Sequence, residues 1–144
     1  MKALDIDQVR AFNRYYTRVL GLLDKHLLDS KFTLPEVRVM YEIYHHKHIT
    51  SSELKDLLGM DKGYLSRMLL KFEKKGLIRK KDSASDGRVQ QLMLSDKGEK
   101  EFLVVNRLSQ NQIAELLSGL SAQDVTRLVG YMLGIKGILE KVTS

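Results

Sequence analysis

A run of turn and capping residues in the middle of the chain most restricts the possible fold. Two capped helical segments are joined by a turn at Gly59, and two strand-like runs follow at 77–81 and 89–94. The intervening DSASDG, residues 82–87, consists almost entirely of turn formers. Two short helices with a tight turn are typical of a helix-turn-helix, and a following hairpin adds a wing. We therefore expect a mainly α protein whose winged helix-turn-helix core, with a two-stranded hairpin, spans residues 33–94.

Capping signals predict where the central helices begin. The tetrapeptides TLPE (33–36) and TSSE (50–53) have the spacing of a capping box, in which threonine and glutamate side chains each bind a backbone amide. Asp61 is placed to cap the next helix. We expect these apolar faces on the three helices: Val37, Met40, Tyr41 and Tyr44; Leu54, Leu57 and Leu58; and Leu65, Met68, Leu69 and Phe72.

Long amphipathic helices are expected on both sides of this core. Apolar spacing of three and four predicts a helix from about Ile6 to Leu28, and Ser95 caps another that reaches about Leu117. The last helix repeats Val125, Leu128, Met132, Ile135, Leu139 and Val142. A small domain cannot easily bury all these stripes, so we expect residues 1–32 and 95–144 to form the dimerisation region of a homodimer. The alternative is a monomer whose outer helices pack on each other.

The positive charge of the chain is concentrated in the segment after the glycine turn. Nine of its 24 lysine and arginine residues lie between Lys62 and Arg88, against only three acidic residues, Glu73, Asp82 and Asp86. This segment alone therefore carries a charge of +6, which equals the formal net charge of the whole chain. Such a concentration favours binding to a polyanion such as DNA, to which the release of counterions adds affinity. The alternative is a solvated basic face.

Other features narrow the class of protein. There is no cysteine, which excludes disulfides and thiolate metal sites and agrees with the cytoplasmic location that we expect. No apolar run approaches the length of a membrane span, so we expect no membrane partner. Neither a glycine-rich phosphate loop nor a nucleophile elbow is present, and we expect no enzymatic activity and no cofactor.

Four motifs together resemble the MarR family of transcriptional regulators: LGMDKGYLSR (58–67), FEKKGLI (72–78), DGR (86–88) and LMLSDKG (92–98). The likeness covers essentially the whole chain, and the pairing of EKKGLI with DGR and LSDKG at this distance is specific. Residues 61–78 also resemble the regulatory half of fusions to a GNAT-type acetyltransferase, although the chain leaves no room for a catalytic domain. The resemblance implies a dimeric regulator that binds a pseudo-palindromic operator in double-stranded DNA, as a repressor released by a small molecule.

The resemblance implies that the basic helix enters the major groove. The residues of this region expected to contact DNA are Ser51, Ser52, Lys62, Gly63, Tyr64, Ser66, Arg67 and Lys71. Those in the first turns of the two helices can meet phosphate at a helix N-terminus, and Ser66 and Arg67 are best placed for base edges. Lys71 is assigned to phosphate or to solvation of the helix end. Tyr64 has two open interpretations, contact with the groove or cover for the edge of the core.

Within the wing, Arg88 matches by position the arginine that reaches the minor groove, and Asp86 matches the acid that supports it. A guanidinium group gains from the negative potential of a narrow minor groove, and a nearby carboxylate can fix its direction. DGR is also an ordinary turn sequence, and that is the alternative.

In this family, small phenolic or carboxylate ligands bind between the dimer helices and the winged helix. Arg14 and Arg18, spaced by four residues on the first helix, offer a site for such an anion, although a solvated helix face is the simpler interpretation. The further candidates for the pocket are Tyr15, Tyr16, Tyr41, Tyr44 and His26.

His45, His46 and His48 invite a metal interpretation, since imidazole binds zinc, copper and nickel. No matching cluster of carboxylates or thiols accompanies them, so we take them as surface or helix-capping residues and expect no metal site. Two alternatives to a DNA-binding regulator stay open: a protein-interaction module with the same fold, and a sensor whose ligand or metal response matters more than its DNA contacts.

Overall fold

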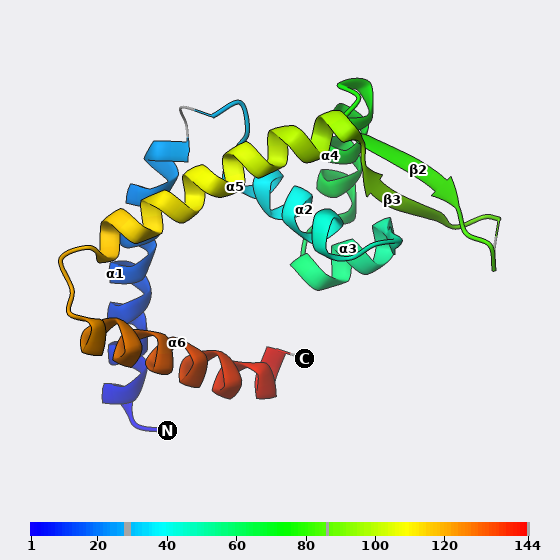
Figure 1. Cartoon of the computed structure of the whole chain (residues 1–144). Helices are drawn as coiled ribbons and strands as arrows, with labels where there is room; N and C mark the ends of the chain where they lie inside the picture. Colours follow the sequence, from blue (N-terminus) through cyan, green and yellow to red (C-terminus); the bar gives the residue numbers. More distant parts are fainter. Residues whose placement is uncertain (28–29, 86, 144) are drawn as a thin grey trace. The chain divides into compact units, whose positions relative to one another are not determined.

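Figure 1 shows the computed structural model, which describes residues 1–27, 30–85 and 87–143, without the side chains of residues 24–27. The elements are α1 (Ala3–Leu27), α2 (Leu34–His45), β1 (Ile49–Thr50), α3 (Ser51–Leu58), α4 (Lys62–Lys74), β2 (Ile78–Asp82), β3 (Gln90–Leu94), α5 (Asp96–Leu117) and α6 (Ala122–Thr143). The chain divides into two compact units, Met1–Ser109 and Gln110–Ser144, and α5 belongs to both. The mainly α winged helix-turn-helix expected from the sequence is confirmed.

The core of the first unit lies where α2, α3 and α4 meet the sheet and the start of α5. Phe72 of α4 and Phe102 of α5 are fully buried, together with Leu54 of α3 and Leu92 of β3. The predicted stripe of α4 is buried along its whole length. Because burial of apolar surface is the main driving force of folding, this stripe fixes which face of α4 turns outward.

The predicted apolar faces of α2 and α3 are correct only in part. Tyr41 of α2 is 43% exposed, whereas Val39 and Ile43, which the prediction omitted, are buried. Helix α2 is in contact with both α3 and β3, so its buried surface is wider than one stripe. On α3, Leu54 is fully buried but Leu57 is 51% exposed. A helix of eight residues with one packed side buries only part of its apolar set.

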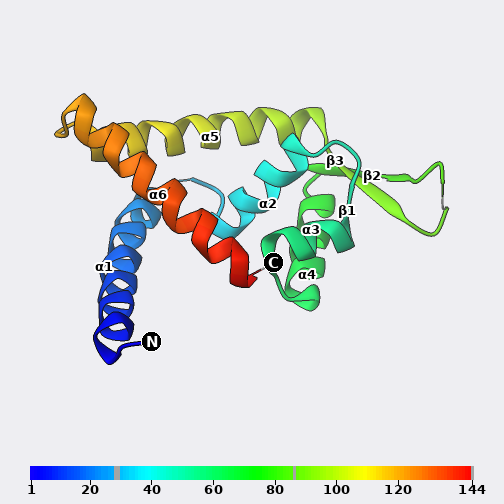
Figure 2. The same cartoon turned by 90° about the horizontal axis from the view of Figure 1, so that it is seen from below.

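The predicted hairpin forms, and a third strand extends it. Strands β2 and β3 are antiparallel, with Ile78 opposite Leu94 at the base. Strand β1 pairs with the other edge of β3 through Ile49 and Leu92, so the order is β1-β3-β2. The hairpin projects beyond α3 and α4 (Figure 2). Its outer part is therefore exposed beyond the helices.

In the second unit, no residue of α6 is buried. Four members of its predicted apolar stripe are at least 42% exposed: Met132, Ile135, Leu139 and Val142. Ser121 caps the start of the helix, since the Asp124 amide donates to Ser121 Oγ at 3.1 Å. The unit by itself thus leaves a long apolar helix uncovered.

Candidate nucleic-acid interface

The predicted capping box at the start of α3 is confirmed. Thr50 Oγ1 accepts the amide hydrogen of Glu53 at 3.1 Å, and Glu53 Oε2 accepts that of Thr50 at 3.0 Å. These two bonds satisfy backbone donors that have no partner within the helix. Ser51 and Ser52 form the exposed first turn directly after the cap. Their hydroxyls are accessible to a ligand at the helix N-terminus.

The turn between α3 and α4 is set by two residues. Gly59 has a φ of +60° and ends α3 in the left-handed conformation that favours glycine. Asp61 then caps α4, and its carboxylate accepts the amide hydrogen of Tyr64 at 2.9 Å. This local chemistry gives the two helices their helix-turn-helix connection.

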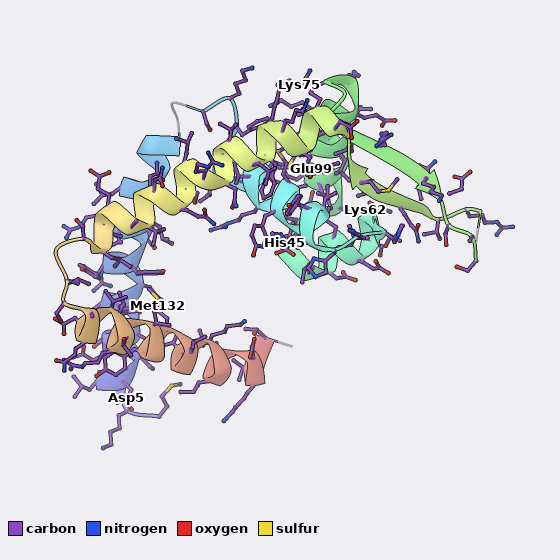
Figure 3. All side chains as sticks on the ribbon, in the orientation of Figure 1. Asp5, His45, Lys62, Lys75, Glu99 and Met132 are labelled. Atoms are coloured by element: carbon purple, nitrogen blue, oxygen red, sulfur yellow. The ribbon has the colours of Figure 1, made fainter. Side chains whose placement is uncertain are left out.

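The outward face of α4 carries the residues expected to contact DNA. Lys62, Ser66 and Arg67 are exposed, and Gly63 is half-buried in the first turn. The Tyr64 side chain is 42% exposed, which favours its role on the outer surface over cover for the core. Figure 3 shows Lys62 at the start of α4 and Lys75 just beyond its other end, so cationic groups flank the helix.

The wing adds cationic residues along β2 and in the loop that leads to β3. Arg79, Lys80 and Lys81 are consecutive and exposed on β2, and Arg88 is exposed in the loop. Asp86, the predicted support of Arg88, lies outside the described residues. The structure thus presents the wing arginine at the surface and leaves the assignment of Asp86 a prediction.

A groove of about 460 Å³ brings residues from α3, α4 and the wing together. Its lining includes four of the predicted DNA contacts: Ser51, Ser52, Ser66 and Arg88. The buried Leu69 and Leu92 form its apolar floor. Three polar side chains of the lining were not predicted as contacts, namely those of Thr50, Lys80 and Gln90. The alternation of side chains along the two strands was the signal that could have indicated Lys80 and Gln90.

Two lysines of the basic segment have carboxylate partners. Lys71 Nζ lies 2.9 Å from Glu36 Oε1, and Lys80 Nζ lies 3.1 Å from Glu73 Oε2. The first pair also corrects the predicted capping box at the start of α2. Thr33 Oγ1 does accept the Glu36 amide hydrogen, at 3.4 Å, but the Glu36 carboxylate turns to Lys71 rather than back to the cap. Glu36 lies too far away in sequence for a local pattern to indicate this pairing.

The predicted ligand-pocket residues fall into two separate sets. On α1, the Arg18 guanidinium is 5.8 Å from the centre of the Tyr15 ring, Tyr16 stacks on a neighbouring phenylalanine, and Arg14 is exposed. The second set, on α2, consists of Tyr41 and Tyr44, which pack against Phe102. No hydrogen bond, ion pair or ring contact joins the two sets within the described residues, and the side chain of His26 lies outside them.

A second cavity of about 210 Å³ includes none of these residues. It is lined by Lys31, Phe32, Lys75, Leu77, Lys97 and Glu101. Neither this cavity nor the groove therefore supports the predicted ligand pocket.

The histidines of α2 and the following turn bind their own backbone. His45 Nδ1 lies 2.9 Å from the Tyr41 carbonyl oxygen, and His46 Nδ1 lies 3.1 Å from that of Glu42. Within residues 1–27, 30–85 and 87–143, no group of three or more histidine, aspartate or glutamate side chains is arranged to hold a metal ion. None of the helices in that part of the chain combines the length and the apolar character needed to span a bilayer.

Comparison with known proteins gives a family match and several solved structures with a similar fold. The MarR family model matches residues 32–89. Wild-type apo MarR from E. coli is 26% identical and has a TM-score of 0.76, over 88% of this chain and 94% of that chain. A mutant MarR from E. coli complexed with operator DNA is 26% identical, with a TM-score of 0.75 over 90% and 94% of the two chains. Streptococcus pneumoniae FabT in complex with DNA shares the fold at 20% identity, with a TM-score of 0.78 over 98% and 99%.

The sequence match includes the helix-turn-helix and most of the wing, and the likeness in fold extends over both outer helical regions. The family comprises transcriptional regulators, as the motifs around α4 and the wing indicated. Together, these findings identify the chain as a MarR-like winged helix-turn-helix protein.

Proposed function

We propose that the protein is a dimeric, sequence-specific DNA-binding transcriptional regulator that acts as a repressor. The observation that carries the proposal is the groove in which Ser51, Ser52 and Ser66 meet the wing at Arg88. Hydroxyl groups at a helix N-terminus and a cationic side chain are suited to the phosphates and groove edges of a duplex. The similar E. coli protein, which is complexed with operator DNA, supports DNA as the partner.

Within this proposal, α4 enters the major groove. Lys62 and Gly63 approach a phosphate at the first turn, while Ser66 and Arg67 contact base edges. Arginine binds guanine through two hydrogen bonds, the most common specific contact in the major groove. The burial of the opposite stripe of α4 supports this orientation, since the core holds that face inward.

The wing is proposed to place Arg88 in the adjacent minor groove, with Asp86 as its support. A narrow minor groove concentrates negative potential and attracts an inserted guanidinium. The exposure of Arg88 beyond the core and the projection of the hairpin (Figure 1) support this role.

A homodimer is proposed because the outer helices leave apolar surface uncovered. In α6 alone, Val129, Leu133 and Ile138 are exposed by 47%, 63% and 65%, in addition to the predicted stripe. Exposed apolar surface on this scale marks a protein-protein contact. A two-fold dimer would present two copies of α4 to half-sites about 10 base pairs apart, which predicts a nearly palindromic operator.

We further propose that a small anionic or phenolic effector relieves repression. It would do so by binding one conformation of the dimer better than the other and so changing the spacing of the two α4 helices. The candidate contacts are the arginines and tyrosines of α1 and α2 named above. Their support is chemical: the exposed Arg18 guanidinium lies beside the Tyr15 ring.

Selection of bound fragments from the host genome, followed by gel-shift titration at fixed salt, tests the function. A regulator will retain a small set of fragments with a shared inverted repeat, and its affinity for them will exceed that for bulk DNA by at least about 1,000-fold. Equal retention of all fragments, or no salt-dependent affinity, would contradict the proposal and favour a protein-interaction module.

A further inference from the structure

One ion pair joins α4, the helix proposed to contact DNA, to the first turn of α2. Lys71, in the last turns of α4, donates to Glu36 Oε1 at 2.9 Å. The Glu36 side chain is only 8% exposed, whereas that of Lys71 is 48% exposed. The carboxylate therefore belongs to the interior, and the lysine reaches inward from the surface to meet it.

Burial makes this lysine important to the carboxylate. The second oxygen, Glu36 Oε2, is buried and has no hydrogen-bond partner. A buried charge without a partner is strongly unfavourable. In the described part of the chain, Lys71 is the one cation that pairs with Glu36. Movement of Lys71 toward a DNA phosphate would leave both carboxylate oxygens buried without a partner.

The ion pair lies beside an apolar contact between the same two regions. Phe72, the next residue of α4, is fully buried and packs edge-on against Phe32, with ring centres 6.4 Å apart. Phe32 directly precedes the Thr33 cap of α2. The end of α4 is thus held to the start of α2 by an aromatic contact and by an ion pair on consecutive residues.

The helix ends also favour this arrangement. Glu36 lies in the first turn of α2, where the helix dipole favours negative charge, and Lys71 lies near the end of α4, where it favours positive charge. Each side chain therefore stabilises its own helix while it binds the other. The ion pair therefore links the end of α4 to the start of α2 at a second point, beside the contact between Phe72 and Phe32.

We propose that Glu36 and Lys71 are positioning residues for DNA binding, and that Lys71 orients α4 instead of neutralising a phosphate. This inference rests on the proposed function, since it concerns how α4 is presented to DNA. It replaces the phosphate contact expected for Lys71 from its place in the basic segment.

The two roles of Lys71 predict opposite effects for Glu36→Leu. If Lys71 contacted a phosphate, removal of Glu36 would free the lysine and eliminate a negative charge, so DNA would bind more tightly. If the pair positions α4, the same change will weaken specific binding about three- to tenfold. Leucine keeps the helix and fills the buried space, so the fold is expected to persist.

The experiment measures DNA affinity against salt for the full-length protein and for Glu36→Leu, Lys71→Met and the double variant. We expect each single variant to bind about three- to tenfold more weakly with an unchanged salt slope, and the double variant to bind no more weakly than either alone. As a positive control, Lys62→Met should flatten the slope of log K against log salt by about 0.9 for each phosphate that the variant no longer neutralises. Glu99→Gln, on the exposed surface of α5, controls for the removal of one negative charge.

Amide NMR spectra without DNA add a readout that a phosphate contact does not affect. A positioning role predicts that Lys71→Met shifts the amide resonances of α4 well beyond the substituted residue. Tighter DNA binding by Glu36→Leu, or a flatter salt slope for Lys71→Met, would overturn the inference. If Glu36→Leu does not fold, the slope and spectrum of Lys71→Met decide alone. Failure of the wild-type protein to bind DNA specifically would instead contradict the proposed function.

Discussion

Gly98, in the first turn of α5, packs directly against the backbone carbonyl of Leu77. A Cβ atom at position 98 would lie 1.9 Å from that oxygen. Hydrogen bonds surround the contact: the Ser95 amide donates to the Leu77 carbonyl at 2.9 Å, and the Gly98 amide donates to Ser95 Oγ at 3.0 Å. The start of α5 is thereby joined to the segment between α4 and the wing.

Gly98→Ala is predicted to destabilise the protein. The new methyl group would meet backbone that cannot move without breaking the Ser95 bond, so we expect the free energy of unfolding to fall by about 3 kcal/mol, at the upper end for overpacking. Urea unfolding at a fixed protein concentration measures it. Gly21→Ala is the control. Gly21 also lies within a helix, and a Cβ atom there would meet nothing within 4 Å. Equal stability of the two variants would contradict the tight contact.

Arg88→Ala is predicted to weaken operator binding about tenfold or more while leaving the unfolding curve unchanged. The weaker binding follows from removal of a guanidinium from the minor groove, and the exposed side chain contributes little to the core. Gel-shift titration at fixed salt measures the affinity. Arg107→Ala removes the same charge from the exposed surface of α5 and should bind almost as wild type. Unchanged operator binding by Arg88→Ala would remove Arg88 from the interface.

Arg67→Ala is predicted to relax sequence preference as well as to lower affinity. A base contact through two hydrogen bonds discriminates by about 1–3 kcal/mol at one base pair, whereas removal of a phosphate contact lowers binding to all sequences alike. Titration against the operator, single-base variants and random DNA separates the two. A uniform decrease across all three would make Arg67 a phosphate contact.

Leu133→Glu in α6 is predicted to dissociate the homodimer. It would place a charge on a side chain that is 63% exposed in the single chain and proposed to be buried in the dimer. We expect the dimer dissociation constant to rise by at least about 30-fold, the effect of disrupting the centre of an interface. Sedimentation equilibrium measures this constant. Gln123→Glu adds the same charge near the start of α6, and dissociation by both variants alike would indicate a general charge effect.

Local chemistry explains what the sequence could predict. The Thr50 and Glu53 box and the Asp61 cap are confirmed because their partners lie within three residues. The buried stripe of α4 could be predicted because a helix that packs through one face repeats apolar residues every three or four positions. The motif-based family assignment succeeded for a related reason, since those motifs combine caps, a basic helix face and a wing turn.

Contacts between distant segments explain what the sequence could not predict. Strand β1 pairs with β3 through Ile49 and Leu92, and no pattern near Ile49 indicates that partner. Tyr41 is exposed because the buried face of α2 is centred on Val39, Met40 and Ile43, to one side of the predicted stripe. The expected ligand pocket was predicted from residue types alone. Within the described residues, no contact joins its members on α1 to its members on α2. Asp86 and the side chain of His26 lie outside the described part, so their roles stay predictions.

The sequence alone therefore determined where helices begin, which face of α4 is apolar and where positive charge gathers, because these depend on neighbours along the chain. Tertiary structure decided which of those charges pair with carboxylates of the protein and which remain exposed to a partner. Lys71 looks like another cation of a DNA-binding helix until the fold places Glu36 beside it, 35 residues away in sequence. An ion pair depends on distance in space, and only the packed core sets that distance.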